Sequence, residues 1–411
     1  MSLCRYLPTP SDRMAVIWSL LAVKGSVILE YGPAGTTHFS MGLYGTLGME
    51  FEQRLFTTHM SEDDVVMGDV TRLENAITEL DASYEPEVIF VVASSIAAVI
   101  GTDIKGVCNY MQKEVKAKLI PFSEGGFKGD YSLGIADAYK LIAEKLTGEA
   151  PEKDADSYNI IGASMGRYRM VSDVWEIKNM LNEAYGLKCN ACLCCETSAG
   201  EVAKMGAAAI NIVLCSEAVP AAEYLKEKYG TPYIYCVPYG YKKTFEFFRQ
   251  VGNVLAKMPN MDMMARLGGK TRSFGMLGMY AMMGGMKKRP QAIVKGDYDA
   301  VCGIAGFLEE AGIKVTVKIC SHSLKNIKDA DESIKYYSEE KDWLEIFKNA
   351  KNTLVLADDI ALMQCDGTNT TVRISAPFIN GSQIATHLPF MGEKGADYLL
   401  EAIELYYQRL I

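Results

Sequence analysis

Short apolar runs alternate with longer helical patterns along almost the whole of the 411-residue chain. Residues 26–31, 88–92 and 118–121 have the composition of buried strands, whereas residues 102–118 and 131–146 have the apolar spacing of helices. Regular alternation of this kind is typical of parallel sheets joined by crossover helices. The sequence therefore predicts an α/β fold of three Rossmann-like units, each a mainly parallel sheet flanked by helices.

The three predicted units divide the chain at two places. A charged stretch that contains glycine and proline separates a first domain, residues 1–150, from a second, residues 151–260. A methionine-rich segment then leads into a third domain, residues 261–411, which ends in a predicted terminal helix. We take these ranges as the expected domain boundaries.

Charge and hydropathy exclude several classes of protein. The chain carries 42 Lys and Arg against 51 Asp and Glu, a formal net charge of −9, so no nucleic-acid partner is expected. The longest apolar run, residues 88–100, is shorter than the roughly 20 residues that span a bilayer. The apolar run at residues 14–23 lacks a convincing cleavage site and predicts a helix. We therefore expect a cytoplasmic protein without a membrane span.

Two nucleotide-binding motifs are incomplete or missing. Gly268, Gly269, Lys270 and Thr271 resemble the end of a phosphate-binding loop, but Met264 stands where that loop needs a glycine. No Gly-x-Gly-x-x-Gly sequence follows a predicted strand. The sequence therefore predicts that this chain binds no nucleotide itself.

The turn after the first predicted strand is the clearest candidate for a ligand site. Residues 32–38 read Gly-Pro-Ala-Gly-Thr-Thr-His, and such a turn presents side chains at the carboxyl end of the strand, where open α/β sheets bind ligands. Ser94 and Ser95 follow the next predicted strand and are expected at the same edge. These residues are equally consistent with a simple turn and with hydroxyls that cap the following helix.

Eleven cysteines are scattered over the chain and do not resemble a disulfide framework, so reduced thiols are expected. Four of them lie within residues 189–195, where alternation along a strand places them on two faces. They therefore cannot all bind one tetrahedral ion. Cys194 and Cys195, at the end of the strand, could reach a ligand, whereas Cys189 and Cys192 are more typical of small core residues.

Cys215 ends a further predicted strand, at residues 209–214. Its position predicts a thiol at the carboxyl edge of the second sheet, able to meet a ligand held between domains. Cys108, in contrast, falls on an apolar helical stripe and is typical of a core residue.

Several of these segments, in this order, resemble the nitrogenase component 1 superfamily. That superfamily includes the nitrogenase molybdenum-iron protein subunits, the cofactor-assembly scaffold and the dark-operative protochlorophyllide reductase. Each segment alone is a weak match, but their collinear order covers nearly the whole chain. The matching segments are residues 32–38, 57–68, 100–104, 122–129, 209–215, 229–233 and 391–396.

The resemblance implies a pair of related subunits, each of three α/β domains, that share an iron–sulfur cluster at their interface. In the family, an ATP-hydrolysing iron protein delivers electrons to that cluster. The electrons pass on to a substrate or a larger metal cofactor in a cavity among the domains. The nucleotide then belongs to the iron protein, which agrees with the lack of a nucleotide motif here.

The cluster ligands of the family are only partly matched. Its interface cluster is usually held by three cysteines per subunit, and the corresponding places here hold Cys4, Thr36 and Ser95. Because a hydroxyl is a poorer iron ligand than a thiolate, the chain is either the ligand-poor partner of a cluster or has lost it. Cys215 matches the cysteine that anchors the nitrogenase metal cofactor, whereas the second anchor, a histidine, is replaced near Ser375.

We therefore expect a nitrogenase-like oxidoreductase subunit that acts with a related component 1 subunit and an iron-protein ATPase, and not a true dinitrogen reductase. Two alternatives stay open: a non-catalytic scaffold for assembly of a metal cluster or tetrapyrrole, and a simple α/β protein for a small ligand with structural cysteines. The candidate residues are Cys4, Cys215, Cys194 and Cys195 for metal, Gly32, Gly35, Thr36 and Ser95 for the cofactor, and His38 and His59 for catalysis.

Overall fold

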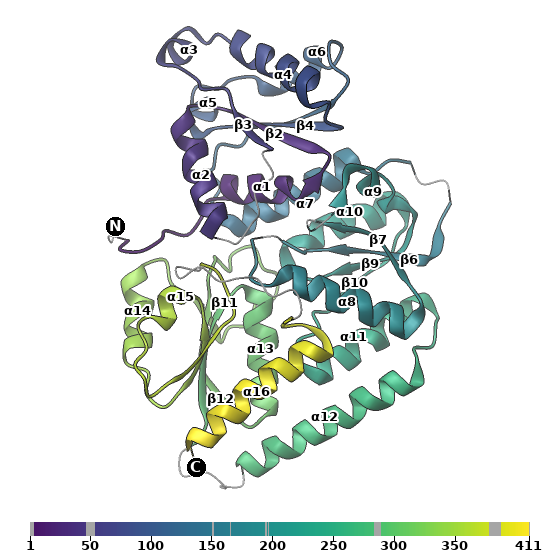
Figure 1. Cartoon of the computed structure of the whole chain (residues 1–411), viewed down its shortest axis with the longest axis vertical. Helices are drawn as coiled ribbons and strands as arrows, with labels where there is room; N and C mark the ends of the chain where they lie inside the picture. Colours follow the sequence, from purple (N-terminus) through teal and green to yellow (C-terminus); the bar gives the residue numbers. More distant parts are fainter. Residues whose placement is uncertain are drawn as a thin grey trace.

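The computed structural model has an α/β fold with three parallel sheets flanked by helices, which confirms the fold class expected from the sequence. The first sheet lies at one end of the molecule, above the second and third, which lie side by side (Figure 1). The structure describes residues 4–46, 54–149, 152–164, 166–193, 195, 197–282, 289–377 and 388–410.

Four parallel strands form the first sheet, in the order β3-β2-β4-β5. Its elements are α1 Asp12–Leu21, β2 Ser26–Tyr31, α2 Ala34–Thr46, β3 Leu55–Thr57, α3 Glu62–Met67, α4 Thr71–Tyr84, β4 Val88–Ala93, α5 Ser95–Val99, α6 Ile104–Met111, β5 Lys118–Phe122 and α7 Tyr131–Leu146. Strands β2 and β4 are buried along their whole length, as expected of apolar runs in a parallel sheet. Helices α4 and α6 cover one face of the sheet, and α1 and α7 cover the other.

The helix predicted at residues 102–118 is shorter than expected, because α6 ends at Met111. Beyond it, the Asp81 carboxylate accepts hydrogen bonds from the backbone amides of Lys116 and Ala117. These amides are therefore satisfied by a neighbouring helix rather than by a continued helix of their own.

The second sheet also has four parallel strands, in the order β10-β9-β6-β7. Its elements are β6 Asp154–Ile161, α8 Met170–Tyr185, β7 Lys188–Leu193, α9 Ala199–Ala203, η1 Met205–Ala207, β9 Ala208–Val213, η2 Ser216–Ala218, α10 Val219–Tyr229, β10 Tyr233–Tyr235 and α11 Gly240–Leu255. Helix α8 ends at Tyr185, and Gly186 after it has a φ of 69°, the left-handed conformation that favours glycine.

Five parallel strands form the third sheet, in the order β13-β12-β11-β14-β15. Its elements are α12 Met261–Met282, β11 Gln291–Gly296, α13 Tyr298–Glu310, β12 Lys314–Cys320, β13 Ile334–Tyr336, α14 Glu340–Lys348, β14 Leu354–Ala357, α15 Asp359–Leu362, β15 Thr370–Arg373 and α16 Gly392–Leu410. The segment 268–271, which resembles the end of a phosphate-binding loop, lies within helix α12.

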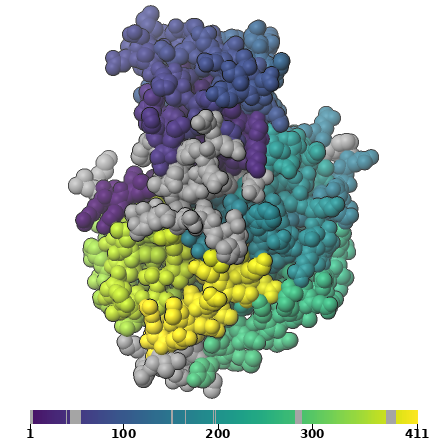
Figure 2. Space-filling model, viewed as in Figure 1, coloured from purple at the N-terminus to yellow at the C-terminus, as the bar shows by residue number. Residues whose placement is uncertain are grey.

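Several segments join one unit to another. The short strand β1, Val23–Lys24, pairs in parallel with β8, Thr197–Ser198, of the second unit. The terminal helix α16 packs against α8 and α11, so one hydrophobic core runs through the second and third units. The N-terminal strap, residues 4–11, crosses the third unit before α1 begins (Figures 1 and 2). These connections bring three sheets around one central region.

None of the described helices has the length and apolar character that crossing a membrane requires.

Candidate functional site

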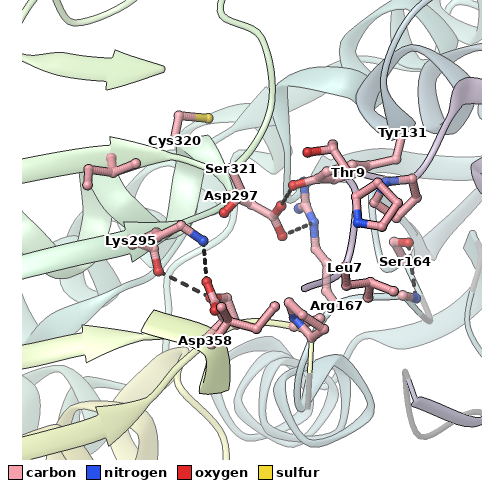
Figure 3. A pocket seen from close by; sticks show the side chains of 18 of the residues that line it. Leu7, Thr9, Tyr131, Ser164, Arg167, Lys295, Asp297, Cys320, Ser321 and Asp358 are labelled. Carbon is pink, nitrogen blue, oxygen red and sulfur yellow. Dashed lines mark hydrogen bonds and ion pairs between the residues drawn. The ribbon is translucent and has the colours of Figure 1, made fainter. Parts of the chain in front are cut away.

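A cavity of about 110 Å³ lies where the three units meet (Figure 3). The first unit contributes Trp18 from α1, and Tyr131 and Ile135 from α7. The second unit contributes the loop after β6, and the third contributes residues at the carboxyl ends of its strands. Ligands bind at this edge in open α/β sheets, so the position of the cavity follows from the topology.

The wall from the third unit carries two carboxylates and a lysine. Lys295, in strand β11, forms an ion pair with Asp358, and both side chains are buried. Asp358 directly follows β14, and its other oxygen accepts a hydrogen bond from the Ala361 amide at the start of α15. The Lys295 ammonium also lies 4.3 Å from the centre of the Trp343 ring. The lysine is therefore fixed by a carboxylate and an aromatic face together.

Arg167 is the cation of the opposite wall. Its guanidinium lies 3.0 Å from Glu217 Oε2 and 3.2 Å from Asp297 Oδ2. Asp297 directly follows β11 and accepts a 2.5 Å hydrogen bond from the Tyr131 hydroxyl. Burial raises the pKa of Tyr131 further above neutrality, and the charge of Asp297 adds to this, so the phenol keeps its proton. Figure 3 shows Arg167 and Tyr131 converging on this carboxylate.

A second layer of acidic groups lies behind Arg167. Glu217 Oε1 lies 3.5 Å from the ring of His322, which is fully buried. Asp299 accepts hydrogen bonds from the Ser216 amide, at 3.0 Å, and from the Tyr235 hydroxyl. Burial, with a contribution from Glu217, raises the pKa of Asp299 to about 6. The cavity therefore has charged groups of both signs, each held by a neighbour.

Cys215 lies beside this layer and not on the cavity wall. The thiol is fully buried after β9, and a Cβ at Gly162 would lie 2.8 Å from its sulfur. It forms a hydrogen bond with Glu217. Burial raises the pKa of Cys215 well above its usual value, with Glu217 and Asp299 adding to the rise, although Arg167 opposes it. Cys215 is therefore a protonated, covered thiol in this conformation.

The N-terminal strap forms one side of the cavity through Leu7, Pro8, Thr9 and Pro10. It is attached to the third unit at Glu340, whose carboxylate accepts hydrogen bonds from the backbone amides of Arg5, at 2.7 Å, and Tyr6, at 3.2 Å. Figure 2 shows the strap, in purple, against the yellow-green surface of that unit. Cys4 is exposed at the start of the strap, with its sulfur 3.6 Å from Glu340 Oε1.

The first-sheet edge, residues 30–37 with Ser94 and Ser95, is a separate region. Strands β2 and β4 are neighbours, and a Cβ at Gly32 would lie 2.4 Å from the Ser94 Cβ. The Ser95 hydroxyl donates a 2.6 Å hydrogen bond to the carbonyl of Gly125. Gly35 has no atom within 4 Å of its Cβ position. The two turns expected at one edge therefore do meet there.

Glu30 is the centre of the first-sheet edge and is fully buried. Arg13 of helix α1 donates a 2.6 Å hydrogen bond to it. The hydroxyls of Thr36 and Thr37 each donate a 2.9 Å hydrogen bond to its carboxylate. The polar groups of this edge therefore point inward to one another, and the Thr36 hydroxyl is already used.

The remaining candidate residues lie apart from the cavity. His38, on α2, and His59, after β3, are exposed on the first unit. Cys195 is fully buried in the core of the second unit, and Cys194 lies outside the described residues.

The expectation that alternation separates Cys192 from Cys195 is wrong. The chain turns after β7, where the Cys195 amide donates a 2.9 Å hydrogen bond to the Cys192 carbonyl. The two thiols consequently lie in one core and form a hydrogen bond with each other.

No three His, Cys, Asp or Glu side chains form a metal-binding group within the described ranges. Of the cysteines that the structure describes, only Cys320, at the end of β12, lies on the cavity wall. The described residues therefore do not fit a metal cluster held by this chain alone, because such clusters need several thiolates or imidazoles.

Sequence reasoning missed the charged residues of the cavity, although a signal for them existed. Asp297 and Asp358 directly follow strands β11 and β14, and Lys295 lies within β11. The same rule drew attention to Ser94 and Cys215. Aspartate is common in turns and at helix starts, so the rule alone does not separate a site residue from a cap.

The family of the chain can be stated from its similarity to known proteins. The model of the family described as nitrogenase component 1 type oxidoreductase matches residues 11–404. The chain belongs to this family. A NifE protein from Nostoc sp., named as a nitrogenase iron-molybdenum cofactor biosynthesis protein, is 30% identical over 251 residues, which are 60% of this chain and 51% of that protein. The nitrogenase molybdenum-iron protein alpha chain of Clostridium pasteurianum is 31% identical over 224 residues, 52% of this chain and 41% of that one.

Solved structures agree with the fold. The structure of nitrogenase Cp1 at pH 6.5 superposes with a TM-score of 0.78 at 16% identity, covering 99% of this chain and 94% of the other. The sequence matches to the NifE proteins of Nostoc sp. and C. pasteurianum span about half the length of those relatives.

Proposed function

We propose that this chain is a subunit of a nitrogenase component 1-type oxidoreductase and that its substrate binds in the cavity among the three α/β units. The observation that carries the proposal is the cavity itself. It lies at the carboxyl ends of the strands of the third sheet, is covered by helices α1 and α7, and is closed on one side by the N-terminal strap. Such a junction is where α/β proteins place ligands.

In this proposal the residues of the chain bind and enclose the substrate. The strap and the rings of Trp18 and Trp343 exclude water, which strengthens polar interactions inside the cavity. Asp297 is held between Arg167 and the Tyr131 hydroxyl, so its carboxylate stays fixed while substrate enters. The chain's share of the chemistry is therefore placement of the substrate in a preformed polar frame.

Electrons would come from outside this chain, from an ATP-dependent iron protein by way of an iron–sulfur centre. The family membership supports this route. The metal ligands would come mainly from a related partner subunit, with Cys4 as a candidate at the exposed end of the strap. Thr36 and Ser95 make hydrogen bonds within the protein, so we assign them no metal.

A second candidate is a scaffold for assembly of a metal cofactor. It is favoured by the similarity to NifE, whose name describes cofactor biosynthesis. A scaffold would hold a metal cluster as its cargo and release it, whereas a reductase would turn over a substrate.

Anaerobic purification of the chain with the proteins encoded beside it separates these functions. A reductase subunit is expected to give turnover that requires an iron protein, ATP and a low-potential electron donor. It should also lose that turnover, but not its partners, in Leu7→Trp, where a larger side chain enters the cavity from the strap. Transfer of bound metal to an acceptor protein without such turnover would instead establish the scaffold. A metal-free assembly that shows neither property contradicts both.

A further inference from the structure

The charged side chains on the cavity wall are all committed to one another. Lys295 is paired with Asp358, which also caps helix α15. The exposed fractions of their side chains are 9% and 0%. A buried pair of this kind is costly to break, because the charge left behind has no water to solvate it. Neither residue is therefore available to an ionic group on a ligand.

The opposite wall has the same property. Arg167 is shared between Glu217 and Asp297, and Asp297 also accepts the Tyr131 hydroxyl. The wall thus carries two cations, Arg167 and Lys295, and two carboxylates, Asp297 and Asp358, in matched pairs. A carboxylate or ammonium on a ligand would have to displace a partner from one of these pairs.

Two buried polar groups of lining residues have neither a hydrogen-bond nor an ion-pair partner among the described residues: the Ser321 hydroxyl and the Trp18 indole N–H. The rest of the surface is largely aliphatic and aromatic, from Leu7, Ile135, Ile319 and Trp343. A hydroxyl can both donate and accept, so it suits an uncharged polar group.

The size of the cavity limits the ligand further. Its volume is about 110 Å³. An apolar cavity of roughly 150 Å³ is known to hold one benzene molecule. A ligand that fills this cavity is therefore a compact molecule, smaller than a tetrapyrrole or a large metal cluster.

We infer that the cavity takes a compact, uncharged organic molecule with an apolar portion and one hydrogen-bonding polar group. The juxtaposition that carries this inference is a set of matched ion pairs around a small apolar space with a free serine hydroxyl. The inference rests on the proposed function, because it specifies the substrate class of the same cavity.

Three probes of equal length test the charge preference: butyramide, butyrate and butylammonium. They are titrated at pH 7 into the full chain, purified with its natural partners. Binding is followed by saturation-transfer NMR and by the fluorescence of Trp18 and Trp343, which line the cavity. Butyramide is expected to bind at least about 10-fold more tightly than either ion, because only it leaves both ion pairs intact. Equal or tighter binding of butyrate or butylammonium overturns the inference.

Removal of one ion from a pair should reverse the preference. Asp358→Asn leaves Lys295 without its carboxylate, so butyrate should gain about 10-fold over its wild-type affinity. Lys295→Met should do the same for butylammonium, and the double variant should again prefer butyramide. Ser321→Ala, a smaller change, should weaken butyramide alone. If the folded variants keep the wild-type order of probe affinities, the inference is contradicted. Where a variant does not fold, the order of affinities in the wild type still tests the inference.

Failure of the inference is distinguishable from failure of the proposed function. If Leu7→Trp abolishes probe binding but butyrate or butylammonium binds more tightly than butyramide, the cavity is a ligand site and only the charge preference is overturned. Probe binding that Leu7→Trp leaves unchanged shows that the cavity is not the site, and both then fail.

Discussion

The first-sheet edge and the interdomain cavity are built from the same parts but differ in what they leave open. Both lie at the carboxyl ends of parallel strands, and both contain a buried pair of opposite charges, Arg13 with Glu30 in one and Lys295 with Asp358 in the other. At the first-sheet edge, the hydroxyls of Thr36 and the neighbouring threonine donate hydrogen bonds to the Glu30 carboxylate, and the turns after β2 and β4 are in contact. In the cavity, space remains beside the ion pairs, because three units meet there. Polar residues at the end of a strand therefore line a cavity only where a second unit leaves space beside them.

Helix α1 takes part in both regions, which makes the comparison testable within one molecule. Arg13 reaches Glu30, whereas Trp18, further along the helix, lines the cavity. Gly134 of α7 allows the two helices to approach, since a Cβ there would lie 1.9 Å from the Asp12 carbonyl oxygen. Changes confined to one end of α1 should therefore separate the structural role from the binding role.

The largest expected effect is that of Glu30→Ala. It leaves Arg13 buried without a counter-charge and removes the acceptor of two threonine hydroxyls. The free energy of unfolding of the first transition should fall by about 3–5 kcal/mol in chemical denaturation, the range for breaking a buried ion pair. Glu246→Ala, which breaks the exposed pair with Arg249, is the matched control and should have a much smaller effect. Equal losses in the two variants would show that the first-sheet edge is not held by its buried charge.

The next effect contrasts two glycines of the same turn. Gly32→Ala places a Cβ 2.4 Å from that of the buried Ser94, so we expect a loss of about 1–3 kcal/mol from overpacking. Gly35→Ala enters open space in helix α2 and should gain about 0.5–1 kcal/mol, because alanine favours the helix. Thermal and chemical denaturation of both variants give the comparison. A Gly32→Ala protein as stable as Gly35→Ala would contradict the close contact between the turns.

The sequence was sufficient for the three parallel sheets in outline, because central strands such as β2, β4 and β14 are short apolar runs. The short strands β13 and β15 contain polar and charged residues and gave no such signal. Even Glu30 has a signal, since a carboxylate inside the apolar run of residues 26–31 requires a buried partner. The identity of that partner, Arg13, was not predictable, because it depends on how helix α1 packs on the sheet. Local pattern therefore establishes which strand ends are polar, but not which of them face each other.

The cysteines also show that local sequence pattern does not determine what a side chain contacts. Cys215 lies at a strand end, as its position predicts, yet its thiol is covered and hydrogen-bonded to Glu217. Cys195 turns back into the core through a bend that strand alternation cannot anticipate. The strap is harder still, because its amides find Glu340, a residue 335 positions away in the sequence from Arg5. These placements depend on contacts between units, for which a single sequence carries no pattern.

A pH dependence is expected near the cavity. Asp173 of α8 accepts hydrogen bonds from the amides of Phe390, at 2.6 Å, and Met391, at 2.8 Å, and burial raises its pKa to about 7. The unfolded carboxyl ionises near pH 3.9. The folded state therefore holds an extra proton between these values, and its stability falls as the pH rises from 4 to 7. Asp173→Asn keeps an oxygen acceptor for both amides and should lack this fall.

Chemical denaturation at pH 5 and pH 7 measures how the free energy of unfolding changes with pH in the wild type and in Asp173→Asn. From pH 5 to pH 7, the free energy of unfolding of the wild type should fall by at least about 1 kcal/mol more than that of Asp173→Asn. Asp156→Asn is the control, because the hydrogen bond and charge of Lys257 lower the pKa of that exposed carboxyl. The contribution of Asp156 to stability is lost only as the pH falls below about 4, so Asp156→Asn should show the same fall between pH 5 and 7 as the wild type. A parallel fall in Asp173→Asn and the wild type would rule out Asp173 as the source.

The smallest change in global stability is expected from Glu340→Ala, which detaches the N-terminal strap. The variant removes the acceptor of the Arg5 and Tyr6 amides, so their hydrogen exchange should quicken by about 10-fold, the equivalent of one hydrogen bond. The unfolding midpoint should hardly move, because the strap covers the cavity without forming part of a sheet. Glu332→Ala, an exposed change in the same unit, should leave this exchange unaltered.

The same exchange experiment sharpens the contrast between the two regions. The Gly32 amide donates to the Thr58 hydroxyl within the first-sheet edge and should stay protected in Glu340→Ala. Faster exchange at Arg5 and Tyr6 alone would mean that the cavity opens independently of the rest of the molecule, as a site that admits a ligand must. Exchange that rises at Gly32 as well would mean that the strap and the first-sheet edge unfold together, and the cavity would then have no separate way to open.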